Sequence, residues 1–536
     1  MKRYLCALFL SALASASAAD TRPNIVLIMA DDLGFSDLGC YGSAIETPTL
    51  DGLADDGLRF SQFYNTAKCH SSRVSLLTGL YCDQAGGAKL NRGATIAEVL
   101  RSAGYFTAMS GKWHLSQQPT DFGFQRYFGH LSGACNFFTG DNSFRLNGEA
   151  WKVPKTLNGR RFYTTHAITD FALNFLDDAD KSDKPFLLYV AYNAPHYPLH
   201  APEKDVKKYD GRFDEGWDVI RRRRHQKQLR MGLVPKQWKM APRPDHVPAF
   251  DSLPQSEREW ESDRMEVFAA MVDVLDRSIG RLVADLKQAG ELEYTMILFL
   301  SDNGASPYDH RRSQRNLNQT AWDPEVKWGD STGWAWARNA PFRFYKQNQF
   351  EGGICTPAIV HWPAGLKTNP KSVVDSPVHI IDVVPSLAEI CEAPIPKTWP
   401  GRELREVSGV SLASLFETGK LEKRPPIHLL FEEDRGLRDG DWKLVSFESQ
   451  PWELYNLADD RTELNDLAAQ HPERVKTMAA TWHKMANDVL HAPEDATEPV
   501  SSVVSKVHRQ WSDYGEAYNV TAAHERKHLQ RRKNKP

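Results

Sequence analysis

A cysteine followed by small polar residues and an arginine is the stretch with the clearest reactive potential. The segment from Cys69 to Arg73 precedes an apolar run, which indicates a loop that enters a helix. Cys69 would then lie at the positive end of the helix dipole, where a thiol and a guanidinium meet an anion together. A lone cysteine in this position is nevertheless more often a buried structural residue. Other groups must decide between the two interpretations.

Two adjacent carboxylates follow a strand that is predicted to be buried. The apolar, β-branched run from Asn24 to Ala30 is typical of a central strand covered by helices on both faces. Asp31 and Asp32 come directly after it, and buried carboxylates are costly unless a cation pairs with them. On this motif alone, a solvated acidic turn is an equally good interpretation.

A second strand ends in the same way. The run Tyr294–Ser301 is followed by Asp302 and Asn303. Ligands in open α/β sheets bind at the carboxyl ends of the strands, so the two motifs are expected to meet. Carboxylate and amide oxygens suit Ca²⁺ or Mg²⁺, and the pair of motifs therefore favours a shared hard cation.

Basic residues follow two further predicted strands. Lys112 and His114 come after Tyr105–Met109 and alternate along the chain, so an extended segment directs both to one face. The strand Phe186–Tyr192 leads into a proline-rich loop that carries His196. Either histidine alone is more often structural. Their repeated position just beyond a strand end makes them catalytic candidates.

The composition is that of a large globular protein. The 536 residues are 41% hydrophobic and 25% charged, with a formal net charge of −3, which permits a large core and a second domain. This charge indicates neither a nucleic-acid partner nor a membrane surface. Residues 1–19, with a basic start, an apolar run and small residues, predict a secretory signal peptide. We therefore expect an exported protein, periplasmic or secreted, without a membrane span.

Six cysteines remain after the predicted signal peptide, too few for a disulfide scaffold in a chain of this length. Two other segments have unusual composition. The run Arg221–Arg224 is typical of a solvated helix face, with a role in holding an anionic polymer as the alternative. The polar and aromatic segment Asp309–Phe344 predicts a long surface loop that forms a substrate rim.

The pattern changes beyond about Pro425. Short strands are predicted at Ile427–Phe431, Trp442–Phe447 and Trp452–Asn456, followed by an amphipathic helix at Pro472–Leu490. We interpret residues 20–425 as a catalytic domain and 426–495 as a small domain with an antiparallel sheet and a helix. Residues 496–536 form a basic extension that is predicted to be disordered at its end.

Taken together, these motifs resemble the formylglycine-dependent sulfatases, in the arylsulfatase branch of the alkaline phosphatase superfamily. The family signature, Cys-x-Pro-Ser-Arg with a later Thr-Gly, corresponds here to Cys69-His70-Ser71-Ser72-Arg73 and Thr78-Gly79. Five further motifs follow the family order: Asp31-Asp32, Gly111-Lys112-Trp113-His114, Ala194-Pro195-His196, Ser301-Asp302-Asn303-Gly304, and Lys346 with Glu351-Gly352-Gly353. The resemblance extends from Asn24 to at least Asp466. It implies an α/β fold, with a large mixed sheet sandwiched by helices and a smaller C-terminal domain.

The resemblance also implies a reaction, the release of inorganic sulfate from a sulfate ester. Cys69 would be oxidised to formylglycine by a formylglycine-generating enzyme during export, and a hydroxyl of its hydrate would attack sulfur. One Ca²⁺ ion would be held by residue 69 together with four oxygen ligands, Asp31, Asp32, Asp302 and Asn303. The single departure is Ser71, where the family has proline. We expect Cys69 and Arg73 at the right spacing to suffice for maturation.

Further roles carried over from the family concern charge and proton transfer. Arg73 would hold the hydrate, while Lys112 and Lys346 would bind sulfate oxygens where the transition state is negative. His196 would donate a proton to the leaving alcohol, and His114 would deprotonate the remaining hydroxyl to expel sulfate. His200 is close enough in sequence to substitute for His196.

Two alternative functions are compatible with the same residues. One is a phosphodiesterase or phosphonate monoester hydrolase of the same superfamily. The other is an inactive binder of sulfated glycans, if Ser71 prevents conversion of Cys69. The predicted export and the aromatic, basic segments favour a sulfated carbohydrate over a small aryl ester as the natural substrate.

Overall fold

The computed structural model describes residues 22–245, 247–308, 319–368, 370–432, 434–447 and 450–490. The predicted signal peptide at 1–19 and the extension at 496–536 lie outside these residues. Among the helices that are described, none is long and apolar enough to cross a membrane. All six cysteines after residue 22 are free thiols.

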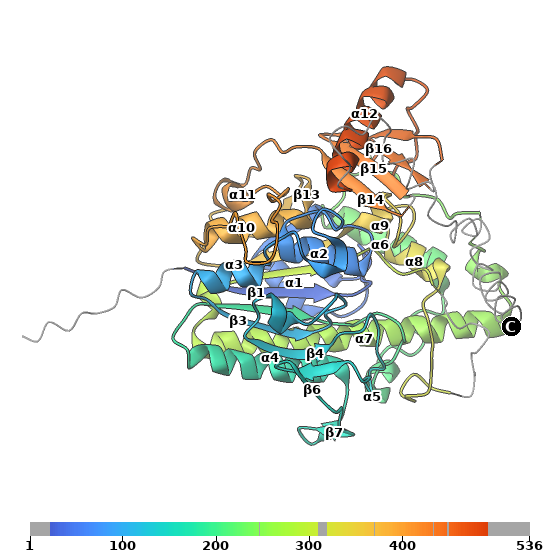
Figure 1. The fold of residues 1–536 in the computed structure, drawn as a ribbon. Coiled ribbons are helices and arrows are strands. Elements are labelled where there is room, and N and C mark those ends of the chain that lie inside the picture. The colour runs from blue at the N-terminus through green and yellow to red at the C-terminus, as the bar shows by residue number, and fades with distance from the viewer. Residues whose placement is uncertain are drawn as a thin grey trace, which may run out of the picture.

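An 11-stranded mixed sheet organises the main part of the molecule (Figure 1). Its centre is β1 (Asn24–Ala30), which pairs in parallel with β10 (Thr295–Ser301) on one side and with β9 (Phe186–Ala191) on the other. Parallel strands continue outward through β3 (Phe106–Gly111) and β4 (Arg126–His130). The remaining strands are β2 (Leu58–Tyr64), β5 (Phe144–Leu146), β6 (Glu149–Ala150), β11 (Cys355–His361), β12 (Ser372–Val374) and β13 (Val378–His379).

Helices cover both faces of this sheet because the central strands are apolar on both sides. Successive side chains of β1 point to opposite faces, so Val26 and Ile28 join one core while Ile25 and Leu27 join the other. The first core is completed by α1 (Pro48–Asp55), α4 (Thr164–Asp180) and the long α7 (Gln255–Ala289). The second is completed by α2 (Cys69–Thr78), α3 (Ile96–Ser102) and α10 (Val383–Ile390). The predicted sandwich is thereby confirmed.

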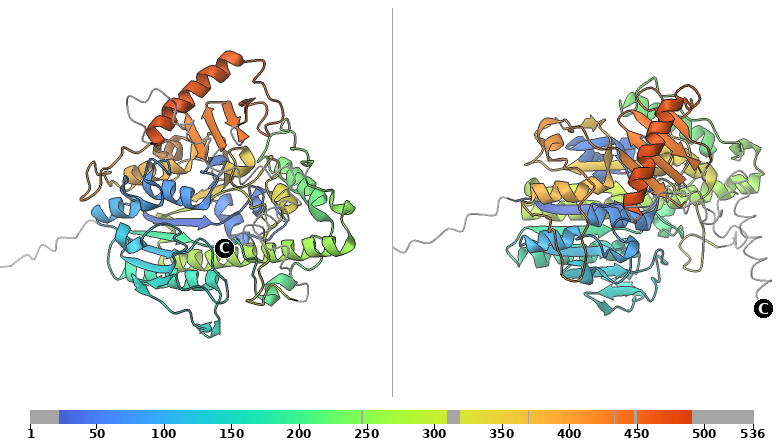
Figure 2. Two further views of the ribbon diagram at one scale, coloured as in Figure 1. Left: turned by 45° about the vertical axis from the view of Figure 1, so that its right-hand side comes forward. Right: turned by 45° about the horizontal axis from the view of Figure 1, so that its top comes forward.

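A smaller antiparallel sheet follows in the C-terminal part (Figures 1 and 2). Its strands are β14 (Ile427–Phe431), β15 (Asp434–Asp439), β16 (Trp442–Ser446) and β17 (Glu453–Asn456), paired in that order. The helix α12 (Pro472–Val489) packs Met478 and Trp482 against Leu437 and Leu444 of this sheet. The predicted sheet with one helix is confirmed, although β15 was missed because its sequence is largely charged. The domain boundary near residue 425 stays a prediction.

The prediction of a surface loop at Asp309–Phe344 is wrong for the part that the structure describes. Residues 309–318 lie outside that part. Beyond them, α8 (Thr332–Arg338) is buried, as are Trp328 and Trp334. The indole of Trp334 donates to the Glu261 carbonyl at 2.7 Å and packs edge-on against Trp217. Trp328 and Trp334 are therefore part of the core, which makes these two rings unavailable as a substrate rim.

The arginine run also behaves differently from its prediction. It lies in α6 (Gly216–Arg230), where Arg222 and Arg223 are exposed but Arg221 and Arg224 are buried, since residues three apart share a helix face. Arg221 donates to the carbonyls of Pro341 and Phe342 at 2.8 Å. The inward half of the run therefore stabilises the fold, and the prediction of a solvated face is wrong for Arg221 and Arg224.

Three other α-helices and one hairpin remain to be described. The helices include α5 (Glu203–Lys207), α9 (Glu351–Ile354) and α11 (Ala413–Thr418), and the hairpin joins β7 (Thr156–Leu157) to β8 (Arg160–Arg161). Short α9 follows the loop that carries Lys346, at the junction between the two sheets.

Candidate active site

The candidate site lies at the carboxyl ends of four neighbouring parallel strands. In sheet order, β10 leads to Asp302 and Asn303, β1 to Asp31 and Asp32, β9 to the loop with His196, and β3 to Lys112. Ala30 is in register with Ser301, so the residues that follow them lie side by side. The parallel topology therefore brings together groups that are almost 300 residues apart in the chain.

The carboxylates form one buried cluster. Asp31 Oδ2 contacts Lys112 Nζ and lies 3.7 Å from Arg73 Nη2. Asp302 Oδ2 lies 3.2 Å from the same Arg73 nitrogen, and its Oδ1 accepts from the Asp32 backbone N–H. Asn303 Nδ2 donates to Asp32 Oδ1 at 2.6 Å. Hydrogen bonds thus connect both strand ends directly.

Cys69 is the first residue of α2 and joins this cluster. Its Sγ, a carboxylate oxygen of Asp31 and one of Asp302 all lie within 4.8 Å of one another. Two anchors fix the start of the helix: the Ser72 hydroxyl donates to the Asp302 carbonyl at 2.6 Å, and Arg73 Nη1 donates to the Lys112 carbonyl at 2.9 Å. The predicted loop-to-helix transition at Cys69 is confirmed.

Three lysines surround the thiol. Burial by itself raises the pKa of Cys69, but Lys346, Lys112 and Lys68 outweigh it and lower this pKa below its usual value. Lys346 Nζ contacts Asp32 Oδ1, and this ion pair keeps the pKa of Lys346 high despite burial. Lys68 was not predicted, because a lysine just before a helix carries no distinctive signal. The site therefore combines carboxylates with a positive rim suited to a tetrahedral anion.

Two buried oxygens of the cluster have no hydrogen-bond partner among the residues described, Asp31 Oδ1 and Asn303 Oδ1. Burial and the neighbouring Asp31 also raise the pKa of Asp302 well above its usual value. By contrast, Lys112, His196 and Arg73 outweigh burial at Asp31 and lower its pKa. Orphaned hard oxygens beside crowded carboxylates fit a divalent cation such as Ca²⁺, which would both bind the oxygens and relieve the repulsion.

His196 lies next to this cluster. Its Nε2 is 3.7 Å from Asp32 Oδ2, and its Nδ1 is 2.8 Å from the Tyr197 carbonyl. That carbonyl accepts from Nδ1–H, so Nε2 carries a proton only in the imidazolium form. Burial outweighs the favourable effect of Asp31 and Asp32 and lowers the pKa of His196 to about 4.

His114 lies two residues after Lys112 and has a backbone φ of 57°. Burial, then Lys112 and Arg73, lower its pKa to about 2, and its Nδ1 has no hydrogen-bond partner among the described residues. Its ring lies 6.0 Å from that of His70. A neutral imidazole with an unpaired ring nitrogen is suited to accept a proton.

His200 is not part of this arrangement. It is fully buried, its Nε2 lies 2.7 Å from the Val326 carbonyl, and its ring packs against Phe138. The suggestion that it could substitute for His196 is therefore not supported by its position.

A second ring of charges holds the turn after β1, in which Asp32 has a φ of 69°. Buried Arg338 donates to the Asp32 carbonyl and pairs with Asp37 at 2.9 Å and with Asp330 at 2.5 Å. Asn339 Oδ1 accepts from Ala305 N–H at 3.2 Å. These residues were not predicted as part of the site, since their contacts depend on segments distant in sequence.

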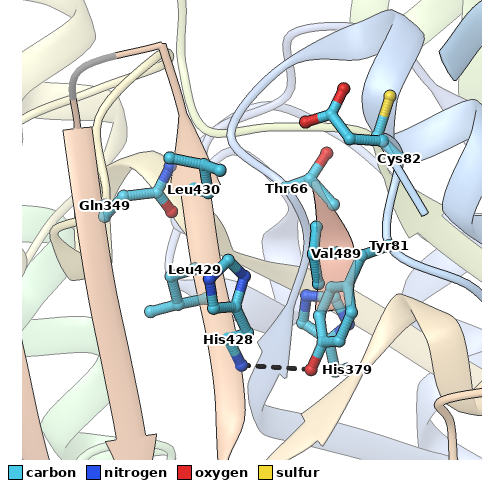
Figure 3. A pocket seen from close by; sticks show the side chains of 10 residues that line it. Thr66, Tyr81, Cys82, Gln349, His379, His428, Leu429, Leu430 and Val489 are labelled. Atoms are coloured by element: carbon cyan, nitrogen blue, oxygen red, sulfur yellow. Dashed lines mark hydrogen bonds between the residues drawn. The ribbon is translucent and has the colours of Figure 1, made fainter. Parts of the chain in front are cut away.

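A small pocket lies beside the site, at the junction of the two sheets (Figure 3). His428 and Leu429 of β14 face Thr66 and Tyr81 across it, and the His428 N–H donates to the Tyr81 hydroxyl at 3.0 Å. Its volume of about 20 Å³ admits a water molecule but no sugar ring. This pocket does not serve as the substrate site.

The fold and the cluster define a hydrolase of the alkaline phosphatase superfamily, and comparisons with known proteins identify its family. The family model described as Sulfatase matches residues 23–393, and one described as N-sulphoglucosamine sulphohydrolase, C-terminal, matches residues 342–489. The chain therefore belongs to the sulfatase family, in agreement with the resemblance seen in its sequence. It is a sulfuric ester hydrolase.

Relatives cover most of the chain. An uncharacterized sulfatase of Schizosaccharomyces pombe is 32% identical, covering 89% of this chain and 96% of that protein. An arylsulfatase of Klebsiella aerogenes is 30% identical, with 74% and 93% covered. An N-acetylglucosamine-6-O-sulfatase of Bacteroides thetaiotaomicron is 27% identical, with 86% of each covered. The solved structure of Ps i-CgsB is 26% identical, with a TM-score of 0.66 over 91% of this chain and 98% of that one.

Proposed function

We propose that this sulfatase releases sulfate from a sulfated carbohydrate, using a formylglycine derived from Cys69 and one bound Ca²⁺. The observation that carries this proposal is the position of Cys69. Its sulfur lies within 4.8 Å of oxygens from Asp31 and Asp302, and lysines on three segments lower its pKa. A structural cysteine needs neither the carboxylates nor the lysines.

Asp31, Asp32, Asp302 and Asn303 would hold the metal ion, and the two unpartnered oxygens support this assignment. When bound, Ca²⁺ would stabilise negative charge on the sulfate, and the formylglycine hydrate would supply the hydroxyl nucleophile. The chain's own residues would bind and orient the sulfate ester and would exchange protons with it and with residue 69.

Positive residues would bind the sulfate group. Lys112 and Lys346 each direct one N–H to a carboxylate, and the positive charge of each ammonium would attract the sulfate oxygens. Arg73 bridges Asp31, Asp302 and the Lys112 carbonyl, and it would hold residue 69 in place from within α2. Fixed charges of this kind stabilise a transition state without reorganisation.

The two histidines would move protons. His196 can donate from Nε2 only as an imidazolium, and the negative charge of a bound sulfate ester would raise its pKa. His114, neutral and with an unpaired Nδ1, would accept a proton from residue 69. We assign His196 as the acid and His114 as the base on these grounds.

The substrate class rests on the relatives. One of them is named as an N-acetylglucosamine-6-O-sulfatase, and the C-terminal family model takes its name from an N-sulphoglucosamine sulphohydrolase. Both names refer to sulfated amino sugars, which supports a sulfated carbohydrate as the substrate here.

Ser71 fits the start of α2, and we propose that it is compatible with maturation. It is the third residue of α2, and the N–H groups in the first turn of a helix have no intrahelical acceptor. Proline and serine are therefore both tolerated there without a change in the helix.

We further propose that residues 1–19 direct export to the periplasm or outside the cell, and that a formylglycine-generating enzyme acts on Cys69 during export. We also propose that residues 20–425 and 426–495 are the two domains.

The test is a comparison of ester substrates. The protein is produced together with a formylglycine-generating enzyme and offered an aryl sulfate and the corresponding aryl phosphate. We expect sulfate to be released at least about a hundredfold faster than phosphate, and Cys69→Ala to show neither activity while keeping its fold. A preference for phosphate would instead favour a phosphonate or phosphodiester hydrolase. Sulfate binding without any turnover would favour the inactive glycan binder.

A further inference from the structure

A wide groove opens beside α4, α5 and α7, on the side of the main sheet away from the C-terminal sheet (Figure 1). Its volume is about 460 Å³, far larger than the junction pocket. Five cationic side chains line it, Arg160, Arg161, Lys204, Arg277 and Arg281, together with the aromatic rings of Phe138, Tyr163 and Trp322. We name this feature the arginine groove. None of these residues belongs to the cluster around Cys69.

We propose that the arginine groove binds a sulfate group on a second sugar unit of an oligosaccharide whose reacting sulfate lies at Cys69. The enzyme would then act on polymers or oligomers that carry at least two sulfates. This inference rests on the proposed function, because it extends the substrate of the same active site.

Three of the five cations are partly neutralised and remain partly exposed. Arg160 and Arg281 share Asp170, at 2.5 and 2.8 Å. Arg277 pairs with Asp205 at 2.6 Å and with Asp273 at 2.7 Å. These ion pairs hold the guanidinium groups in place. Because each guanidinium has five N–H donors, several of these donors remain for a ligand.

The other two cations have no carboxylate partner in the described part of the chain. Arg161 is exposed, donates to the Trp322 carbonyl at 2.9 Å and lies over the Phe138 ring at 4.1 Å. Lys204 is exposed at the start of α5, where the nearby Glu203 pairs with Lys207 instead. The groove therefore keeps positive charge that the protein does not neutralise. This charge stands beside aromatic surface.

That combination matches a sulfated sugar. Guanidinium groups bind the oxygens of tetrahedral anions with two parallel hydrogen bonds, and aromatic rings such as half-buried Trp322 cover the apolar face of a sugar. A free inorganic anion would contact the cationic side chains but not the aromatic rings.

The groove lies at the same edge of the sheet as the active site. Helix α4 packs against β3 and β9 and ends at Asp180, shortly before β9 begins at Phe186. It therefore runs antiparallel to β9 and begins at the edge where the parallel strands end. Tyr163 and His166, at the start of α4, line the groove. The loop after β9 carries His196, and Pro202 of the same loop lines the groove. Six residues of extended chain span at most about 20 Å, a distance that a short oligosaccharide can bridge.

The experiment measures binding and turnover separately. Binding is measured by calorimetry with full-length Cys69→Ala protein and two probes, a heparin hexasaccharide and an iota-carrageenan hexasaccharide, each also in desulfated form. The double substitution Arg161→Gln with Lys204→Gln is added to the same background. We expect at least one sulfated hexasaccharide to bind, its dissociation constant to rise about tenfold in the double variant, and the desulfated forms not to bind.

A matched control removes two exposed positive charges elsewhere, Lys181→Gln with Arg222→Gln, and is expected to change the dissociation constant less than about twofold. In the enzyme with Cys69 intact, the groove substitutions should leave kcat/KM for a small aryl sulfate unchanged.

The possible outcomes separate the two proposals. If the enzyme with Cys69 intact does not hydrolyse the aryl sulfate, the result counts against the proposed function. The groove assignment would be overturned by unchanged hexasaccharide binding in the groove variant, by an equal loss in the control, by no binding of either hexasaccharide, or by tighter binding of a single-stranded DNA oligonucleotide.

Discussion

Two clusters of buried charge in the described part of this protein are built in opposite ways. At the junction of the two sheets, Glu351 is bonded through both oxygens: Oε1 to Lys443 at 2.8 Å, and Oε2 to Arg461 at 2.5 Å and to the Tyr64 hydroxyl at 3.0 Å. At the active site, Asp31 directs one oxygen to Lys112 and leaves the other without a partner among the described residues.

The pKa shifts describe the same contrast. Arg461 and Lys443 outweigh burial at Glu351 and lower its pKa to about 2, which is the behaviour of a carboxylate fully matched by cations. Asp302, equally buried, has its pKa raised by burial and by Asp31. At the junction, both oxygens of Glu351 have partners within the protein, whereas at the active site Asp31 Oδ1 and Asn303 Oδ1 have none among the described residues. Breaking a matched buried pair destabilises a fold, whereas unmatched buried groups with shifted pKa values indicate a candidate functional site.

The largest expected effect is at the unmatched cluster. Asp302→Asn should lower kcat/KM for an aryl sulfate by about a thousandfold, because a metal ligand is lost. The same change relieves repulsion with Asp31, so the metal-free variant should unfold at a temperature no lower than that of the parent. A clear fall in the unfolding temperature would show that Asp302 is structural.

Breaking the matched cluster should have the reverse effect. Lys443→Met leaves Glu463 without its 2.7 Å partner and should lower the free energy of unfolding by about 3–5 kcal/mol, measured in denaturant. The folded enzyme should keep its kcat and KM. Arg223→Ala, which removes the exposed pair with Glu215, serves as the control and should cost less than about 1 kcal/mol. A lower kcat or a higher KM in folded Lys443→Met protein would contradict the assignment of a structural role to the junction cluster.

Calcium should stabilise one cluster only. At a concentration a hundred times its dissociation constant, Ca²⁺ should raise the free energy of unfolding by about 2.7 kcal/mol, and a chelator should remove both this gain and the activity. Asp302→Asn should lose the response, while Lys443→Met should keep it. Activity that survives excess chelator would argue against the metal.

The smallest effect concerns pH at the junction. Burial and Glu351 raise the pKa of Glu463 from 4.5 to about 7, despite the opposing effect of Lys443. The folded protein therefore binds a proton there that the unfolded chain has released. Stability from this group is fully present below pH 4.5 and is lost as the pH rises to about 7. Glu463→Gln should remove this dependence, so its stability relative to the parent should rise by about 1 kcal/mol or more between these pH values. A constant difference would contradict the assignment.

Much of this organisation can be predicted from the sequence, because strong patterns carry it. The run Asn24–Ala30 is a strand with the predicted bounds, and parallel pairing then forces Asp31 toward Asp302. The helix at Cys69 also begins where predicted. These features depend on local periodicity and on the rule that the carboxyl ends of parallel strands meet at one edge of a sheet.

Other features were not predictable in this way. Arg221 and Trp334 look like surface residues in the sequence, yet both are buried because distant segments supply the carbonyl acceptors for their N–H groups. Arg338 supports Asp32 across about three hundred residues of chain, and no local pattern signals that contact. Lys68 joins the site only because the turn before α2 directs it there.

The central claim is that Cys69 is the precursor of the nucleophile, and mass spectrometry tests it directly. The peptide that contains Cys69 is isolated from protein made with and without a formylglycine-generating enzyme, and sulfate release is measured on the same samples. We predict that the aldehyde form appears only with the maturation enzyme and that activity rises in proportion to it. An unmodified thiol in fully active protein would contradict the account.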